Sequence, residues 1–339
     1  TKLLYSIIRQ YSGTDVDYAA FCNSLRSSIL TAFYTPDQIA QAIVNGLFDS
    51  GIQAKNVLDP SAGIGSFVKA FNDSGNHSVT CFEKDLLTAE ILSRLYPHNL
   101  VLGKGFETID ERSLGYFDIV SSNIPFGDYR VYDPLFSGSK DEDKKRSCKD
   151  IHSYFFIKAV DAAREGGLIA FITSQGVMNS PKNDYLRKWL MDKCNLVSAI
   201  RLPDNLFIDS ANTEAPSDLI ILQKNSSKTE QTIREYSFTG IRKLGEVNIN
   251  NYYIDFSRVV HTAVSLGKNQ YGDPAINFLY EGDMDELSTD LYNKICEDCA
   301  VHLDMELYNM YLKTEIPPAK EEDIIEDNAV EEELTPTKE

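Results

Sequence analysis

The sequence predicts an α/β protein with a seven-stranded, mostly parallel sheet and helices on both faces. A helical N-terminal region and a small C-terminal appendage flank it. Three observations predict this fold. Apolar runs of strand length alternate with helical patterns up to about residue 225. Each main polar cluster directly follows one of those runs. The 339 residues are 42% hydrophobic, which is enough for one large core.

The elements follow in chain order. An amphipathic helical region covers residues 1–30, and a helix runs from Asp37 to about Phe48, with Thr35 or Asp37 as its cap and Pro36 near its first turn. We expect strands over 56–58, 79–82, 100–102, 117–120, 168–172, 196–200 and 219–222, and further helices up to Phe71 and over 86–95, 152–164 and 185–192. This alternation is typical of a sheet that binds ligands at the carboxyl ends of its strands.

The signal is weaker beyond residue 225. A β-like stretch over 247–256 and one helical run over 287–312 predict a small appendage. The end of the chain, 316–339, holds nine acids and two lysines without a core-forming pattern, so we expect it to be disordered. The expected units are therefore a helical region (1–30), a main domain (31–225), an appendage (226–315) and an acidic tail (316–339).

Charge and composition limit the possible partners. The formal charge of −18 argues against a broad nucleic-acid surface, because duplex affinity comes largely from neutralised phosphates. Binding to DNA would be local or supplied by another module. No apolar run is long enough to cross a membrane, and we expect a soluble cytoplasmic protein. The six cysteines are predicted to be free thiols. Cys296 and Cys299, with His302 nearby, lack a second ligand pair, so no metal is expected.

The segment from Asp59 to Gly65 has the features of a nucleoside-binding turn. Gly63 and Gly65 remove side chains where a strand turns into a helix, so a ligand can lie against the backbone. Asp59 precedes the glycines, where it would repel a pyrophosphate but suits a cationic sulfonium amino acid. Glu83 ends the next strand, where a carboxylate can accept both ribose hydroxyls.

A second segment, Asn123-Ile124-Pro125-Phe126, follows the fourth expected strand. It offers a side-chain amide, a carbonyl and an aromatic face at one place. Together with the glycine turn, it predicts transfer of a methyl group to an exocyclic amine. Methylation at a cytosine carbon would require a Pro-Cys nucleophile, and that dipeptide does not occur in the sequence.

Jointly these segments resemble the S-adenosylmethionine-dependent amino-methyltransferases of DNA, in the order of the gamma class of N6-adenine enzymes. The segment 33–36 resembles the one that lies over the methionine end of the cofactor in that class. The segment 201–207 resembles the stretch after the sixth strand in type I modification subunits and in fused helicase–methylase proteins of mobile elements. The likeness covers about residues 29–225. It implies a Rossmann-like class I methyltransferase, S-adenosylmethionine as cofactor, DNA as partner, and a separate specificity or helicase module in a restriction–modification or mobile-element system.

The resemblance also implies roles for particular residues. The Asn123 side-chain oxygen and the Ile124 carbonyl would accept the two N6 hydrogens of a flipped adenine, and Phe126 would stack on the base for ~1–3 kcal/mol. Pro125 favours an extended conformation of Ile124, which helps to aim that carbonyl. The expected cofactor-binding residues are Tyr34, Thr35, Pro36, Asp59, Pro60, Ser61, Ala62, Gly63, Gly65, Glu83, Phe106 and Asn123.

Two positions depart from the family pattern. Ile124 stands where most relatives have a second proline, and its N–H needs a partner. Gly105 precedes Phe106 where the family often has an acid or Asn that contacts the adenine of the cofactor.

Several alternatives stay open. The chain could be a non-catalytic DNA-recognition or scaffolding part of a helicase-linked complex, or it could methylate an RNA or protein amine. The lysine-containing loop 137–150 either holds a DNA backbone or is a solvated loop. Ser174-Gln175-Gly176 is a candidate to line the base pocket.

Overall fold

The fold is taken from a computed structural model that describes residues 9–10, 12–16, 18–19, 21, 34–75, 77–208, 214–269 and 272–312. Most of the region expected to be helical over 1–30, and the whole acidic tail, lie outside these residues. In the described part of the chain, no helix is long and apolar enough to cross a membrane.

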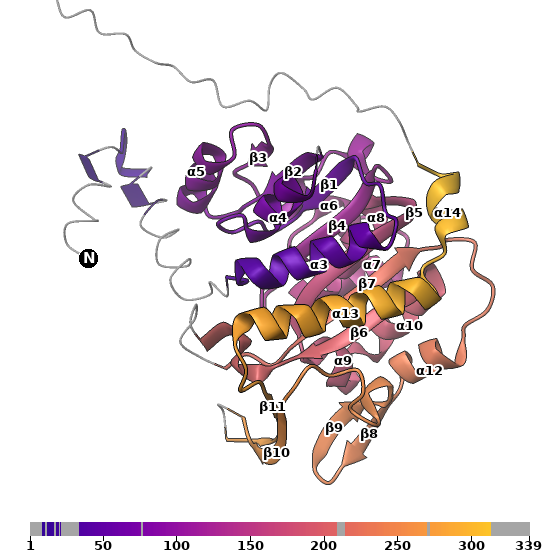
Figure 1. Cartoon of the computed structure of the whole chain (residues 1–339). Coiled ribbons are helices and arrows are strands. Elements are labelled where there is room, and N and C mark those ends of the chain that lie inside the picture. Colours follow the sequence, from indigo (N-terminus) through magenta and orange to yellow (C-terminus); the bar gives the residue numbers. More distant parts are fainter. Residues whose placement is uncertain are drawn as a thin grey trace, which may run out of the picture.

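The described residues form the expected seven-stranded sheet (Figure 1). Its order is β3-β2-β1-β4-β5-β7-β6, and every neighbouring pair up to β5 is parallel. Only β7 runs antiparallel to its two neighbours. The strands are β1 (Asn56–Asp59), β2 (Ser78–Phe82), β3 (Leu100–Leu102), β4 (Phe117–Asn123), β5 (Ala163–Ser174), β6 (Cys194–Leu202) and β7 (Ser217–Lys224).

Helices cover both faces of the sheet because its strands are apolar on both sides. One face packs against α3 (Asp37–Asp49), α4 (Ser66–Ser74), α5 (Leu86–Leu95) and α13 (Met284–His302). The other face packs against α8 (Ile151–Ala162) and α10 (Asp184–Lys193). The sheet therefore has one apolar core on each of its faces. The ends of the strands are left uncovered by these two layers of helices.

The helix α13 joins the main core, although it lies far along the chain in the expected appendage. It runs beside α3 (Figure 1). A Cβ at Gly46 would lie 2.7 Å from Cγ2 of Ile295, so the two helices meet at a residue without a side chain. The helical run expected over 287–312 is in fact two helices, α13 and α14 (Met305–Met310), with Asp304 capping the second. The limits of the four units stay a prediction.

The other described residues after 225 include the helix α12 (Ile233–Thr239) and two hairpins. They are β8 (Ile241–Leu244) with β9 (Val247–Asn250), and β10 (Ala263–Lys268) with β11 (Pro274–Leu279). Only β9 falls within the β-like stretch predicted from the sequence.

The segment 137–150 is not simply a loop. It contains the end of α6 (Pro134–Ser137) and all of α7 (Glu142–Ser147). Its entry is fixed by Asp133, whose carboxylate is fully buried and accepts hydrogen bonds from Lys158 Nζ and the Tyr154 hydroxyl, both at 2.7 Å. Much of its basic charge is used internally, since Lys144 pairs with Asp161 at 2.5 Å and Arg146 stacks on Tyr185.

Candidate functional site

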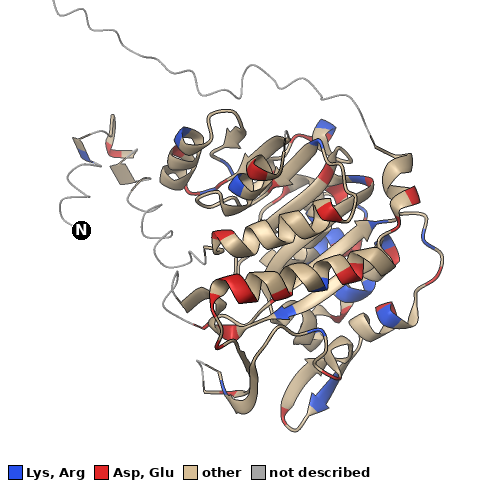
Figure 2. Cartoon of the chain, viewed as in Figure 1, with Lys and Arg blue, Asp and Glu red and all other residues tan. Residues whose placement is uncertain are grey.

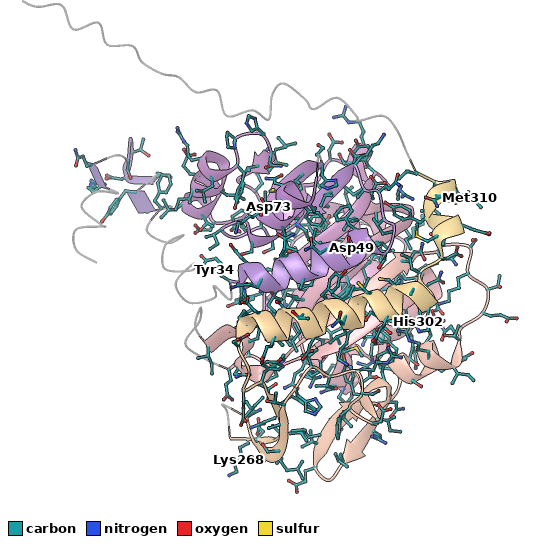
Figure 3. All side chains as sticks on the ribbon, viewed as in Figure 1. Tyr34, Asp49, Asp73, Lys268, His302 and Met310 are labelled. Carbon is teal, nitrogen blue, oxygen red and sulfur yellow. The ribbon has the colours of Figure 1, made fainter. Side chains whose placement is uncertain are left out.

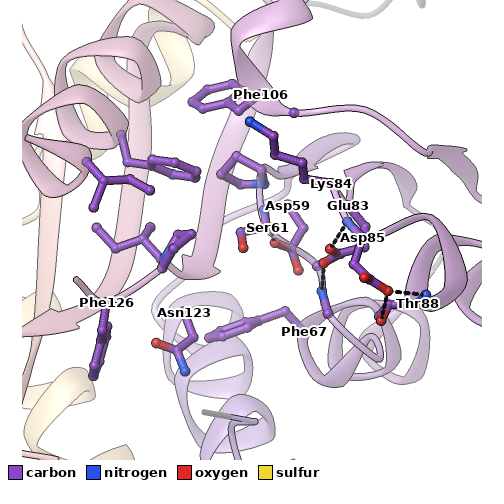
Figure 4. Close-up of a pocket in the computed structure, with 18 of the residues that line it drawn as sticks. Asp59, Ser61, Phe67, Glu83, Lys84, Asp85, Thr88, Phe106, Asn123 and Phe126 are labelled. Atoms are coloured by element: carbon purple, nitrogen blue, oxygen red, sulfur yellow. Dashed lines mark hydrogen bonds between the residues drawn. The ribbon is translucent and has the colours of Figure 1, made fainter. Parts of the chain in front are cut away.

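A cavity of about 620 Å³ opens at the carboxyl ends of β1, β2 and β4 (Figure 4). It is lined by both segments that the sequence singled out. Every predicted catalytic and cofactor-binding residue lines it except Pro36 and Gly65, whereas Ser174, Gln175 and Gly176, the candidates for the base pocket, do not. The predicted residues along its wall are Tyr34, Thr35, Asp59, Pro60, Ser61, Ala62, Gly63, Glu83, Phe106, Asn123, Ile124, Pro125 and Phe126.

The glycine turn is held by the strand beside it. The N–H of Ala62 donates to the Phe82 carbonyl at 2.9 Å, and the N–H of Gly63 donates to Oε2 of Glu83 at 2.8 Å. The other oxygen of Glu83 accepts from the Asp85 N–H at 2.7 Å. Burial raises the pKa of Glu83, which these backbone bonds partly oppose. The carboxylate is therefore fixed in orientation on the cavity wall.

Gly65 is required by packing. Its φ is +93°, and a Cβ there would lie 2.6 Å from Cδ1 of Leu92 and 2.6 Å from the ring of Tyr96. The glycine thus lets α4 and α5 approach each other, while Gly63 (φ +54°) faces the cavity and the ring of Tyr34. The two glycines of the motif have different reasons to be glycine.

Asp59, at the end of β1, is 1% exposed. Its Oδ1 accepts hydrogen bonds from the Ser122 hydroxyl at 2.7 Å and the Ser61 N–H at 3.2 Å. Burial raises the pKa of this carboxyl to about 7, against the opposing effect of those two bonds. Because the pKa of Asp59 is close to neutral, a cation nearby would shift this carboxyl toward its charged form.

Tyr34 and Thr35 close one side of the cavity. The Ser66 hydroxyl donates to the Thr35 carbonyl at 2.8 Å, which ties Thr35 to α4. Thr35 Oγ1 is buried and has no hydrogen-bond partner among the described residues. The expected cap of α3 is wrong: Pro36 occupies the cap position, no side chain caps the helix, and Asp37 instead pairs with Lys69 at 2.7 Å.

The Asn123-Ile124-Pro125-Phe126 segment leaves β4 at the same edge. The Ile124 N–H, which a proline would lack, donates to the Ile172 carbonyl at 3.0 Å, so β5 satisfies it. The ring of Phe126 lies 6.2 Å from that of Phe207, edge to face, and 6.1 Å from that of His152. His152 is itself buried between the Thr173 and Ser174 hydroxyls, and burial lowers its pKa.

Sequence reasoning missed Glu107. A Cβ at Gly105 would collide with the Glu107 carboxyl group, whose carbon lies 2.5 Å from that position. The carboxylate thus fills the space that a side chain at 105 would take, and it lines the cavity with Lys84, its partner at 3.0 Å. Phe106, which lies between Gly105 and Glu107 in the sequence, is 1% exposed and packs on Phe82 and Phe155. The available signal was an acid two residues after the glycine.

Sequence reasoning also missed other residues of the site. They are Ser122, Ser66, His152, Tyr129 and Arg130. Cys81, Cys148, Cys194, Cys296 and Cys299 are free thiols. No group of His, Cys, Asp or Glu in the described ranges is arranged to hold a metal ion.

A sheet of this order, with a glycine turn after β1 and a fixed acid after β2, defines the class I S-adenosylmethionine-dependent methyltransferases, whose cofactor is S-adenosylmethionine. The predicted fold class is confirmed. Residues 95–261 match the family described as N-6 DNA methylase. The family suggested by the sequence motifs is therefore confirmed as well.

Two curated relatives and one solved structure illustrate the likeness. The chain is 26% identical over 208 residues to "Defense against restriction protein B" of Escherichia phage P1, which covers 60% of the chain and 9% of that protein. It is 22% identical over 218 residues to "Type II methyltransferase M.PstI" of Providencia stuartii, covering 58% of the chain and 42% of that protein. A type I restriction–modification methyltransferase subunit from Streptococcus thermophilus aligns with a TM-score of 0.49 and 17% identity, over 81% of the chain and 60% of the subunit.

Proposed function

We propose that this chain transfers a methyl group from S-adenosylmethionine to the N6 amine of an adenine flipped out of DNA. The observation that carries the proposal is that the glycine turn and the Asn123–Phe126 segment line a single cavity of about 620 Å³. A donor lying against the first and an amine held by the second would be neighbours. The match of residues 95–261 to the N-6 DNA methylase family supports the same chemistry.

The residues of the cavity suit S-adenosylmethionine. When bound, the cofactor supplies an electrophilic methyl group on a cationic sulfonium. Glu83 would accept the ribose hydroxyls with its fixed carboxylate. Asp59 would face the cationic methionine end, and Thr35 Oγ1 would gain the partner that it lacks among the described residues. Phe106 would line the adenine end.

On the acceptor side, the chain would hold and orient the amine. The lone pair of an adenine N6 is delocalised into the ring, so two acceptors on its hydrogens favour a pyramidal nitrogen. Asn123 Oδ1 and the Ile124 carbonyl would be those acceptors. Phe126, supported by Phe207, would stack on the extruded base. Catalysis is then mainly alignment, without a covalent enzyme intermediate.

Cofactor binding should depend on pH through Asp59. Because the pKa of Asp59 is raised to about 7, acidification below that value protonates it and removes its attraction for a cation. We expect the Kd for S-adenosylmethionine, measured by calorimetry, to rise by up to roughly tenfold per pH unit below pH 7. Asp59→Asn should bind weakly with a flat pH profile. An unchanged slope in that variant would contradict the assignment.

Glu107 should make the contact to the adenine of the cofactor that a side chain at position 105 makes in the family. We expect Glu107→Ala to weaken S-adenosylmethionine binding by roughly 10- to 100-fold, the range for a hydrogen bond to a charged group. Gly105→Asp alone should also weaken binding, because the new side chain meets Glu107. The double variant Gly105→Asp/Glu107→Ala should bind better than either single variant. Additive losses in a calorimetric double-mutant cycle would show that the carboxylate does not act at this position.

The substrate is tested by giving the purified chain methyl-labelled S-adenosylmethionine with DNA, RNA or cell-lysate protein. We expect label in DNA, recovered as N6-methyladenine by mass spectrometry of nucleosides. Label confined to RNA or protein would replace DNA as the substrate. Cofactor binding without transfer to any polymer would favour a scaffolding role.

We also propose that the chain works with further modules in a restriction–modification or mobile-element system. It spans less than half the length of either curated relative, and one of those is named for defence against restriction. A specificity or helicase module would lie in the remaining length or in a partner.

A further inference from the structure

The two hairpins after residue 225 are fastened to the loops at the carboxyl edge of the sheet. Asn250 at the end of β9 donates through its backbone N–H to Oδ1 of Asn179, at 3.0 Å, and through its side chain to the Met178 carbonyl, also at 3.0 Å. Both partners lie on α9 (Gly176–Asn179), the short helix that follows β5. The hairpin β8–β9 therefore lies where β5 ends.

The other hairpin is fastened to the loop after β6. Phe278 on β11 donates its N–H to Oδ2 of Asp204 at 3.1 Å, and Asn205 exchanges hydrogen bonds with the backbone of Tyr280 at 2.9 and 3.1 Å. Asp204 and Asn205 belong to the 3₁₀ turn Asp204–Phe207, whose last residue supports Phe126. The single 3₁₀ turn Asp204–Phe207 thus connects the hairpin β10–β11 to the ring of Phe126, which is proposed to stack on the base.

A groove of about 450 Å³ lies between these hairpins and the loop after β5. Side-chain amides are its main polar feature. They belong to Gln175, Asn179, Asn248 and Asn269. Its buried Arg201 carries no free charge, because Asp218 accepts from its Nε at 2.6 Å. Asp273 adds one exposed carboxylate. The amide oxygens of Gln175, Asn179 and Asn269 accept hydrogen bonds from within the chain, so these side chains offer mainly N–H donors, which match the acceptors on the edges of nucleobases.

A small cavity of about 60 Å³ continues from the groove and shares Gln175 and Asn269 with it. Asp204 lines this cavity and is 2% exposed. Its Oδ1 is buried without a hydrogen-bond partner in the described part of the chain. A buried acceptor of this kind indicates a ligand or water that donates a hydrogen bond, and the amino groups of cytosine and adenine are such donors.

Lysines stand beside the groove on three separate elements. Lys182 follows the groove residue Pro181, Lys243 pairs in register with Asn248, and Lys268 precedes Asn269. Figure 2 shows basic residues on β8, and Figure 3 labels Lys268 at the end of the other hairpin. All three side chains are exposed, and none has a hydrogen bond or ion pair to another described residue. This local positive charge occurs in a protein whose overall formal charge is −18.

We propose that the two hairpins form a compact DNA-reading element, in which the amide-lined groove contacts base edges next to the target adenine and the surrounding lysines contact phosphates. This rests on the proposed function for the position of the adenine. It assigns recognition to the region that the sequence analysis described only as a small appendage. The partner is double-stranded DNA, because edge-reading amides flanked by separate cations are the features of sequence readout in a duplex groove.

The phosphate contacts are tested by DNA affinity, which does not require catalysis. The Kd of the full chain for a random-sequence duplex is measured by fluorescence anisotropy over a series of salt concentrations. We expect Lys243→Ala and Lys268→Ala each to lower the slope of log K against log salt by roughly 0.9. The matched control is Lys193→Ala. Lys193 lies at the amino end of β6, whereas the hairpins are fastened to loops at the carboxyl ends of the strands, so this variant should keep the wild-type slope. Slopes unchanged in both hairpin variants, or tighter binding to an RNA duplex than to DNA, would overturn the proposal.

The base contacts are tested by sequence preference. Genomic DNA from cells expressing the wild type, Asn248→Ala or Gln175→Ala is sequenced for N6-methyladenine, with Asn309→Ala on α14 as the control. We expect each groove variant to relax one position of the methylated motif or to lower its methylation roughly 10- to 100-fold, with unchanged binding of S-adenosylmethionine. An unchanged motif and rate in both groove variants would overturn the proposal and leave the methyltransferase function standing. Lysine-dependent DNA binding without any methyl transfer would instead refute the proposed function and support this element.

Discussion

Replacing Asn123 with alanine is expected to lower the rate of methyl transfer by roughly 10²- to 10³-fold, as for loss of one positioned group that acts in the transition state. The Kd for S-adenosylmethionine should stay nearly unchanged. The reason is that Asn123 ends β4 at the side of the cavity proposed to hold the amine, while the carboxylates of Asp59 and Glu83 lie at the side proposed to hold the cofactor. The measurement is a single-turnover assay of N6-methyladenine, with calorimetry for the cofactor.

Two further variants make this result specific. Asn309→Ala removes an exposed amide far from the cavity and should leave the rate unchanged. Phe126→Ala should reduce transfer by weakening the stack on the base, worth ~1–3 kcal/mol, without removing the acceptors on the amine. A wild-type rate for Asn123→Ala would remove the amide from the mechanism. Equal loss of cofactor binding and of transfer would make Asn123 a cofactor ligand alone.

Replacing Lys158 with methionine is expected to lower the free energy of unfolding by about 3–5 kcal/mol, since it leaves a buried carboxylate without its counter-charge. Both side chains of the Lys158–Asp133 pair are 0% exposed, and Nζ lies 2.7 Å from Oδ2. Asp133 also caps α6 through the N–H groups of Leu135 and Phe136. We expect methyl transfer to fall too, because this pair fixes the segment that follows Phe126. Chemical denaturation measures the change in the free energy of unfolding.

The pH dependence and a control define this effect. Burial would raise the pKa of Asp133, but the bonds from Lys158 and Tyr154 outweigh it and hold the pKa below its ordinary value. The pair therefore stabilises the fold at neutral pH, and its contribution is lost on acidification below about pH 4. Lys145→Met, on α7, loses only an exposed pair with Glu142 and should change little. Asp133→Asn/Lys158→Met should recover part of the loss. A single variant as stable as the wild type would contradict this account.

The sequence by itself determined the elements whose signals are local. The helix over 86–95 and the strand over 100–102 have the predicted limits, because period and turn residues act over a few neighbours. Strand-then-polar patterns also placed Asp59, Glu83 and Asn123 at one edge, since parallel strands end together. The acids and the amide of the cavity wall were therefore predictable from residue types and order, whereas Tyr34 and Thr35 were implied by the family resemblance.

Only the tertiary structure decided which distant groups meet. The carbonyl of Ile172 satisfies the N–H of Ile124, and Leu92 and Tyr96 explain Gly65. Contacts between segments far apart in the chain leave no periodic signal in either one, so α13 beside α3 and the hairpins beside the strand ends could not be predicted. Glu107 shows the same limit at short range: the path of the backbone, and not the spacing in sequence, brings its carboxylate into the space beside Gly105.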